Sequence, residues 1–272
     1  MTSCIAAACR SDDDREPCIV FCSDHRVETE TAGSEIEFKY RWVKSDWPAL
    51  IAGHVSESED ALATVSETLA DKELTNSNVY DLFRAGMNAY KRKVADAYIQ
   101  STLAISYDHF LHYGKEQLSD EVFREVSWEV TRLSLNSQIL TSGFPADGGR
   151  PLLVVLERNF SVTVFKHFAT IGSGSNIANA ALFQRGHAHL KPLSQTIYHV
   201  YEAQRLAQIA PGVGKKMTII VAKPPAKPGE RIMLGQVTAA GQRHLATLYN
   251  RLGLKKVGLF SLPVGDVDWG NR

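Results

Sequence analysis

The sequence predicts an α+β fold in which two antiparallel sheets are covered by helices on their outer faces. Segments of strand length come first and segments of helical periodicity follow, and the second half of the chain repeats this order. Consecutive strands followed by consecutive helices favour stacked layers over an alternating parallel sheet. The 272 residues contain no internal repeat and no clear boundary, so we expect a single domain over 1–272 with a sizeable core.

Four strands are expected at the start of the chain. The first two cover 3–10 and 17–24 and are joined by the polar loop "SDDDRE". The third covers 35–43, where alternation places aromatic side chains on one face and Lys39 on the other. The fourth covers 48–55 and is mostly apolar. These strands form the first part of the predicted sheets.

The pattern then changes to helical spacing. A helix over 56–74 is predicted to begin with a capping box, in which Ser56 is followed three residues later by Glu59. A long helical stretch follows over about 77–113 and another over about 118–135, with a break at Gly114. We expect 77–136 to be a helical insertion in the domain.

The second half of the chain repeats the order of strands and helices. Strands are expected over 137–144, 152–158, 161–172 and 216–222, and the second and third of these form a hairpin that turns at 158–159. Helices are expected over 175–186, 193–210 and 237–252. An irregular tail follows the last helix, so 237–272 forms a C-terminal helix plus tail.

Composition excludes several kinds of partner. Thirty basic residues balance thirty acidic residues, which argues against a nucleic-acid partner or an anionic membrane surface. No segment reaches the roughly 18 apolar residues that a membrane-spanning helix needs, and "CIAAAC" is too short for a signal peptide. We therefore expect a cytoplasmic protein that uses neither a membrane nor nucleic acid.

All four cysteines lie in the first 22 residues, and none suggests a disulfide or a metal site. In a reducing compartment disulfides are disfavoured, and the cysteine spacing does not fit a zinc site. We interpret these cysteines as small buried apolar residues: Cys4, Cys9, Cys18 and Cys22. Histidines fall on separate predicted elements, so we expect no metal.

The second residue carries the first chemical signal. Removal of Met1, which a small second residue favours, would leave Thr2 at the N-terminus. A threonine hydroxyl is a weak nucleophile unless a base takes its proton, and a free α-amine, whose pKa is about 7.7–8.0, can be that base. Such a site also needs a cation, a carboxylate that holds the cation, and a backbone N–H for the oxyanion. Lys39, Asp24 and Gly53 lie on the strands after the first, where they can supply these groups.

This ordered set resembles the β-subunits of proteasomes and related bacterial ring proteases, which are N-terminal-nucleophile hydrolases. The resemblance rests on "TSCI", "CIVFCSDHRV", "FKYRWV" and "ALIAG", and on "FATIGSGSNIANAAL", which is similar to the family's Gly-Ser-Gly segment. No single motif is specific, and the order of the motifs from residue 2 to about 222 carries the resemblance. The pattern is closest to the ancestral-type bacterial proteasome homologues.

The resemblance implies a four-layer αββα sandwich and a role for each site residue. Thr2 would be nucleophile and base, and Asp24 would hold Lys39, which tunes the hydroxyl and the amine. Ser173 would assist proton transfer, and the N–H of Gly53 would stabilise the oxyanion. The resemblance also implies a peptide or protein substrate, self-association into a ring or open spiral, and no cofactor or metal.

Three features depart from the family pattern. Thr2 and Asp24 are several residues further apart than usual, which "SDDDREP" explains as a hairpin insertion. The family commonly has a second Asp and a Ser near 206–212, and neither is present here. Glu28 stands where the family has a threonine that holds the substrate backbone.

The leading hypothesis is a threonine-type peptidase that works as a proteasome-like homo-oligomer. The departures leave two alternatives: a catalytically inactive scaffold or assembly protein, and an amidohydrolase for a small non-peptide amide. A dinucleotide-binding interpretation of "GSGSNI" is disfavoured, because the third glycine and the surrounding βαβ unit are missing.

Overall fold

The computed structural model describes residues 2–13, 15–25, 27–28, 33–34, 40–225 and 232–253. Lys39, one of the predicted site residues, lies outside these ranges, as does the side chain of Glu28. Contacts between Cα atoms divide the chain into two units, Met1–Val237 and Thr238–Arg272, which are described separately. Both five-stranded sheets belong to the first unit.

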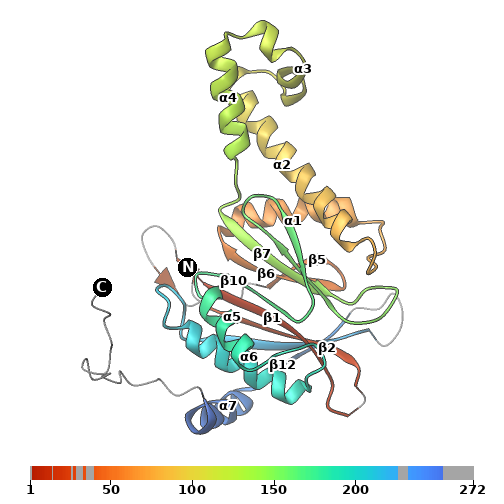
Figure 1. Ribbon diagram of the computed structural model, residues 1–272, viewed down its shortest axis with the longest axis vertical. Helices are drawn as coiled ribbons and strands as arrows, with labels where there is room; N and C mark the ends of the chain where they lie inside the picture. The colour runs from red at the N-terminus through yellow and green to blue at the C-terminus, as the bar shows by residue number, and fades with distance from the viewer. Residues whose placement is uncertain are drawn as a thin grey trace, which may run out of the picture. The chain divides into compact units, whose positions relative to one another are not determined.

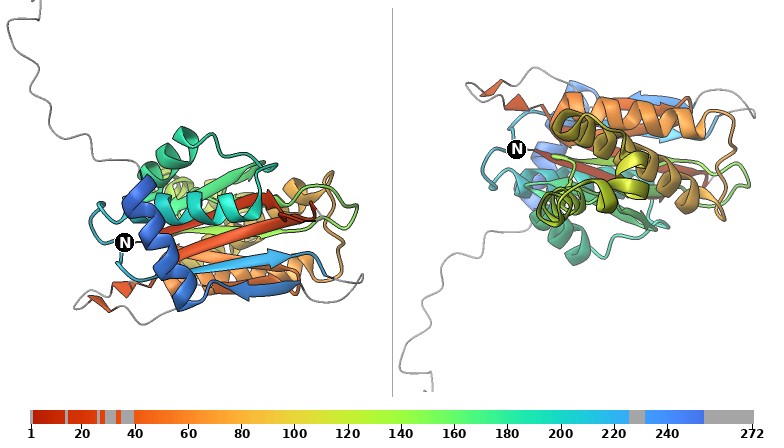
Figure 2. Two further views of the ribbon diagram at one scale, coloured as in Figure 1. Left: turned by 90° about the horizontal axis from the view of Figure 1, so that it is seen from below. Right: turned by 90° about the horizontal axis from the view of Figure 1, so that it is seen from above.

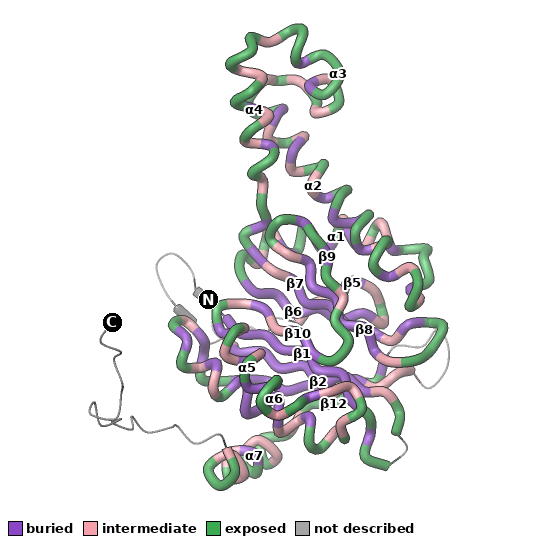
Figure 3. The backbone as a smooth tube through the Cα atoms, viewed as in Figure 1, coloured by how far each residue is buried: buried purple, intermediate pink, exposed green. Residues whose placement is uncertain are grey.

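The first sheet is antiparallel and has the strand order β10-β1-β2-β11-β12 (Figure 1). Its strands are β1 (Ser3–Arg10), β2 (Pro17–Asp24), β10 (Phe168–Gly172), β11 (Met217–Lys223) and β12 (Met233–Gln236). Nearly every residue of β1 and β2 is buried, because layers of structure cover both faces of these central strands (Figure 3). This explains why both segments are continuous apolar runs and do not alternate.

The second sheet is also antiparallel, with its strands in sequence order, β5-β6-β7-β8-β9. Its strands are β5 (Tyr40–Lys44), β6 (Trp47–Gly53), β7 (Ser137–Gly143), β8 (Leu152–Leu156) and β9 (Val162–Phe165). A separate two-stranded ladder joins β3 (Val27–Glu28) to β4 (Gly33–Ser34).

The described part of the first unit contains six helices. They are α1 (Val55–Leu69), α2 (Val79–Leu103), α3 (Tyr107–Gln117), α4 (Asp120–Arg132), α5 (Ser175–Gln184) and α6 (Leu193–Ala207). Helices α5 and α6 contact strands of the first sheet, and α1 and α2 contact strands of the second (Figure 2). Helices α3 and α4 pack on α2 and on each other. In the second unit, α7 (Ala239–Leu252) has Thr238 as its N-cap residue, whose hydroxyl accepts a hydrogen bond from the N–H of Gly241.

The two sheets pack face to face through a shared apolar core. Alternate residues of β1, namely Cys4, Ala6 and Ala8, belong to a cluster that also contains Leu50 of β6 and Leu140 of β7. Small side chains on β1 let the sheets approach closely. A second cluster joins the other face of the second sheet to α1 and α2, and a third lies within α2, α3 and α4.

These observations confirm the predicted α+β class with two antiparallel sheets, and the arrangement is compatible with a sandwich. The β8–β9 hairpin is present, with its turn between Leu156 and Val162. The interpretation of the cysteines as small buried residues is also confirmed, since all four are buried. None of the described helices is long and apolar enough to cross a membrane.

The predicted capping box at Ser56 is wrong. Helix α1 begins at Val55 with His54 as its N-cap residue, and no side chain caps it. The positive φ of Gly53 turns the chain directly from β6 into the helix, so the helix starts earlier than the box requires. The Glu59 carboxylate instead accepts a hydrogen bond from Arg41 at 2.8 Å.

The predicted helix break at Gly114 is also wrong. The break follows α2, where Ala104 adopts a left-handed φ of 56° and Ser106 caps α3 by accepting a hydrogen bond from the N–H of His109. Gly114 lies inside α3, and a Cβ there would come within 3.0 Å of the Phe110 ring. The glycine therefore permits close helix packing.

The predicted strand over 161–172 proves to be two strands in different sheets. β9 pairs with β8 in the second sheet, whereas β10 pairs with β1 in the first. Only Lys166 and His167 separate β9 from β10. The crossing at this point brings the end of β10 beside the start of β1.

Candidate functional site

The strand register gathers three of the predicted site residues at one end of the first sheet. Strand β1 begins directly after Thr2, and both neighbours of β1 run antiparallel to it. The ends of β2 and β10 therefore lie beside the start of β1, with Ser3 opposite Gly172. Asp24 is the last residue of β2, and Ser173 follows the last residue of β10.

Asp24 is the centre of this group. It is fully buried, and its Oδ1 atom accepts hydrogen bonds from the hydroxyl of Thr2 and, at 3.4 Å, from the N–H of Ser3. Its Oδ2 atom accepts from the N–H of Gly214 at 2.6 Å. A carboxylate away from water needs such donors, because an unsatisfied buried charge is very costly. These contacts hold the Thr2 hydroxyl against a fixed acceptor.

Ser173 contacts the backbone of Thr2. Its hydroxyl oxygen lies 3.2 Å from the Thr2 carbonyl oxygen and 3.5 Å from that of Pro211. The N–H of Gly174 donates to the same Thr2 carbonyl at 3.3 Å. Gly172 makes this approach possible, since its φ is +90° and a Cβ there would lie 2.3 Å from the Thr2 carbonyl oxygen. The Gly-Ser-Gly segment thus clamps the backbone of Thr2.

Gly53 lies at the same end of the two sheets. The side-chain oxygen of Gln138 accepts a hydrogen bond from the N–H of Gly172 at 3.2 Å, and Gln138 is paired with Ala52, the neighbour of Gly53. Gly53 has a φ of +123°, and a Cβ there would lie 2.4 Å from the Asn136 carbonyl oxygen. Both the conformation and the space require glycine at this position.

Three contributors to this region carry no motif that sequence inspection would detect. Gly214 donates through its backbone, and Gln138 links the two sheets through its amide. The third is a contact of 2.5 Å between His25 Nε2 and Thr218 Oγ1, which joins the residue after β2 to β11. Only the closely spaced glycines of "PGVGKK" hint that the loop before β11 approaches another backbone.

The buried cysteines of β1 and β2 are poor competitors as nucleophiles. Burial raises the pKa of the Cys22 thiol, and the neighbouring Cys4 and Asp24 raise it further. Hydrogen bonding with Cys18 and burial together raise the pKa of Cys9. Because the thiolate is the reactive form, these groups stay protonated and inert at neutral pH.

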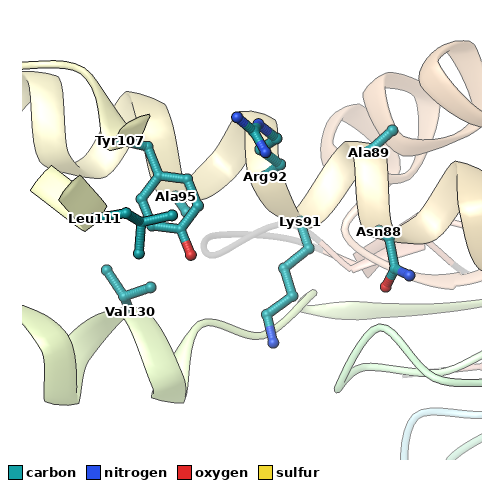
Figure 4. Close-up of a pocket in the computed structure, with 8 residues that line it drawn as sticks. All are labelled: Asn88, Ala89, Lys91, Arg92, Ala95, Tyr107, Leu111 and Val130. Atoms are coloured by element: carbon teal, nitrogen blue, oxygen red, sulfur yellow. The ribbon is translucent and has the colours of Figure 1, made fainter. Parts of the chain in front are cut away.

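A cavity of about 470 Å³ lies elsewhere, among α2, α3 and α4 (Figure 4). Tyr107, Leu111 and Val130 line its apolar end, and the charged side chains of Lys91 and Arg92 also border it. It holds none of the predicted site residues. Within the described ranges, no three His, Cys, Asp or Glu residues are grouped so that they could bind a metal ion.

Comparison with known proteins adds no family assignment. The sequence matches no family model and no curated protein. The function must therefore be argued from the site.

Proposed function

We propose that the protein is a threonine-type N-terminal-nucleophile amide hydrolase, a peptidase that acts once Met1 has been removed. The single observation that carries the proposal is the hydrogen bond from the Thr2 hydroxyl to buried Asp24. Two further contacts support it, namely the Gly214 N–H on the same carboxylate and Ser173 on the Thr2 backbone. A buried carboxylate that holds a threonine hydroxyl at the start of the chain suits a positioned nucleophile.

In the proposed reaction, the Thr2 Oγ1 atom attacks the carbonyl carbon of a peptide bond. Its proton passes to the free α-amine of Thr2, and the N–H of Gly53 donates to the developing oxyanion. The C–N bond then breaks, and the α-ammonium returns its proton to the departing amine. Water next attacks the ester on Thr2, which releases the acid and regenerates the hydroxyl. Asp24 orients the hydroxyl before the attack and accepts its hydrogen bond again once the ester is hydrolysed, and Lys39 lowers the pKa of the amine.

The proposed fold and assembly follow from the same hypothesis. Two packed sheets with helices on their outer faces support a four-layer αββα sandwich of the N-terminal-nucleophile type. Large apolar side chains of the first unit that are more than half exposed offer surfaces for contacts between copies in a ring or spiral: Leu111, Tyr113, Trp128, Phe183, Leu190 and Ile209. Such an assembly would enclose the sites and select unfolded peptide substrates.

Two observations favour a second candidate, a scaffold without activity. Thr2 is only 3% exposed, and the loop over 206–212 lacks the Asp and Ser of the family pattern. That loop region supplies backbone groups at this place, the carbonyl of Pro211 and the N–H of Gly214. A scaffold, however, does not require a threonine hydroxyl held by a buried carboxylate.

Labelling by a peptide epoxyketone, measured by intact mass spectrometry, distinguishes the peptidase from the inactive scaffold. The reagent needs both the Thr2 hydroxyl and its free amine, so we expect one label per chain on protein that has lost Met1. Thr2→Ala should abolish labelling, whereas Thr163→Ala, an exposed threonine on β9, should label normally. Retention of Met1 in the native host rules out the peptidase mechanism, and a processed protein that takes no label favours the scaffold.

A further inference from the structure

A second cavity lies at the opposite end of β1 from Thr2. It has a volume of about 380 Å³, within the range of small-molecule sites. Its walls come from the β1–β2 hairpin, the loop before β8 and the loop between α5 and α6: Cys9, Arg10, Arg15, Pro17, Gly149, Arg150, Pro151 and His189. At about 3.3 Å per strand residue, the length of β1 places this cavity roughly 25 Å from Thr2.

Three arginines border this cavity, and no described carboxylate neutralises them. No ion pair of Arg10, Arg15 or Arg150 occurs in the described part of the chain. Two acidic residues of the adjoining loops accept hydrogen bonds from groups outside the cavity lining. Asp12 accepts hydrogen bonds from the N–H and hydroxyl of Ser194, and Asp147 accepts them from Asn76. The residues that line the cavity thus include three arginines and no carboxylate, so the lining is positively charged.

Arg150 contributes a donor that the described residues leave without an acceptor. Its Nε atom is buried, yet it has no hydrogen-bond partner among the described residues. A buried donor without an acceptor costs about 1–3 kcal/mol, and a charged donor costs more. An anion in the cavity would supply the acceptor that the protein itself does not.

The pKa of a histidine at the cavity is consistent with a positively charged lining. The rings of His167 and His189 stack with their centroids 5.0 Å apart, and their Nδ1 atoms lie 3.0 Å from each other. The pKa of His189 is lowered by burial, and the charges of His167, Arg150 and Arg10 lower it further. A bound anion would offset this repulsion.

We infer that this cavity binds a small organic phosphate. Arginine forks match the oxygens of a phosphate and can bind it in bidentate fashion, and three arginines line this cavity. The cavity is larger than a lone phosphate needs, and Pro17 and Pro151 provide apolar walls for an attached ring. This site is independent of the proposed peptidase and can be present whether or not Thr2 is active.

Calorimetric titration of the full chain with phenyl phosphate tests the inference. Inorganic phosphate and benzoate serve as comparison ligands at matched ionic strength. We expect phenyl phosphate to bind at least tenfold more tightly than either, because it combines the phosphate with an aromatic ring. Binding should weaken at least tenfold in Arg150→Gln and in Arg15→Gln, and the second variant changes an exposed side chain that should not disturb folding. Arg124→Gln, an exposed arginine on α4, is the matched control and should bind as the unchanged protein does.

Absence of heat with phenyl phosphate in a folded protein overturns the inference. So does equal binding by Arg15→Gln and the unchanged protein, which would mean that the arginines do not form the site. Tighter binding of inorganic phosphate than of phenyl phosphate would overturn the assignment to an organic phosphate.

Discussion

The hydroxyl of Thr2 donates a hydrogen bond to the carboxylate of Asp24, although 22 residues separate the two in sequence. The antiparallel pairing of β1 with β2 produces this contact, since it places the end of one strand beside the start of the other. Gly214, from a loop almost 200 residues further on, donates to the same carboxylate.

Asp24→Asn should lower the free energy of unfolding by about 1–3 kcal/mol. The carboxylate accepts from Thr2, Ser3 and Gly214, and an amide would turn one of its oxygens into a donor that faces another donor. Urea unfolding measures the loss. The exposed Asp71→Asn is the control and should change stability by less than about 0.5 kcal/mol. Equal stabilities for the two variants would contradict the buried network.

Gly53→Ala should lower the free energy of unfolding by more than about 2 kcal/mol. The backbone conformation at this position is strained for any residue with a Cβ, and the Cβ would collide with the Asn136 carbonyl. Gly235→Ala on β12 is the matched control, since a Cβ there meets nothing within 4 Å. Thermal unfolding compares the two variants. A tolerated alanine at Gly53 would show that the turn into α1 does not need glycine.

Arg185→Met should lower the free energy of unfolding by about 3–5 kcal/mol, since it removes the guanidinium that pairs with the fully buried Glu202 and leaves the Tyr198 hydroxyl as a donor to the same carboxylate. The guanidinium binds both carboxylate oxygens, at 2.6 and 2.8 Å. Arg84→Met removes an exposed ion pair with Asp81 and should lower the free energy of unfolding by about 0–1 kcal/mol. Denaturant unfolding of both variants checks the ranking, and similar losses would refute it.

Stability should fall as the pH drops from about 6.5 toward 4. Burial lowers the pKa of His187 to about 4, and burial together with Arg185 lowers that of His199 to about 4. Each ring is therefore neutral in the folded protein where the unfolded chain is already protonated, and the unfolded state binds more protons in this window. The expected loss at pH 5 is on the order of 1–2 kcal/mol for each ring.

Substitution of one histidine separates the effect of histidine protonation on stability from that of carboxylate protonation. His187→Gln keeps a donor for the Ala8 carbonyl, which His187 Nε2 contacts at 3.1 Å, and should reduce the difference in unfolding free energy between pH 7.5 and pH 5. His244→Gln, an exposed histidine of the second unit, should leave that difference unchanged. An unaltered pH dependence in His187→Gln would mean that other groups cause the loss.

Local sequence patterns were sufficient where one short segment decides its own structure. Strands β1 and β2 were predicted at their observed bounds, because uninterrupted apolar runs end at polar loops. The local sequence pattern gave a wrong prediction where the pairing with a neighbouring strand decides the structure of a segment. "SVTVFKHFATIG" contains no break signal, yet it divides between two sheets, and only their separate pairing partners divide it.

For the candidate site too, some features follow from the sequence and others only from the tertiary structure. The sequence by itself determined which residue types are available at the start of the chain: a threonine at position 2, an aspartate that ends a strand, a lysine and a Gly-Ser-Gly turn. Only the tertiary structure decided that Asp24 and Ser173 both contact Thr2, and that Gly214 and Gln138 take part. The physical reason is that a backbone N–H has no side-chain signature, so its position is set by strand register and by the path of distant loops.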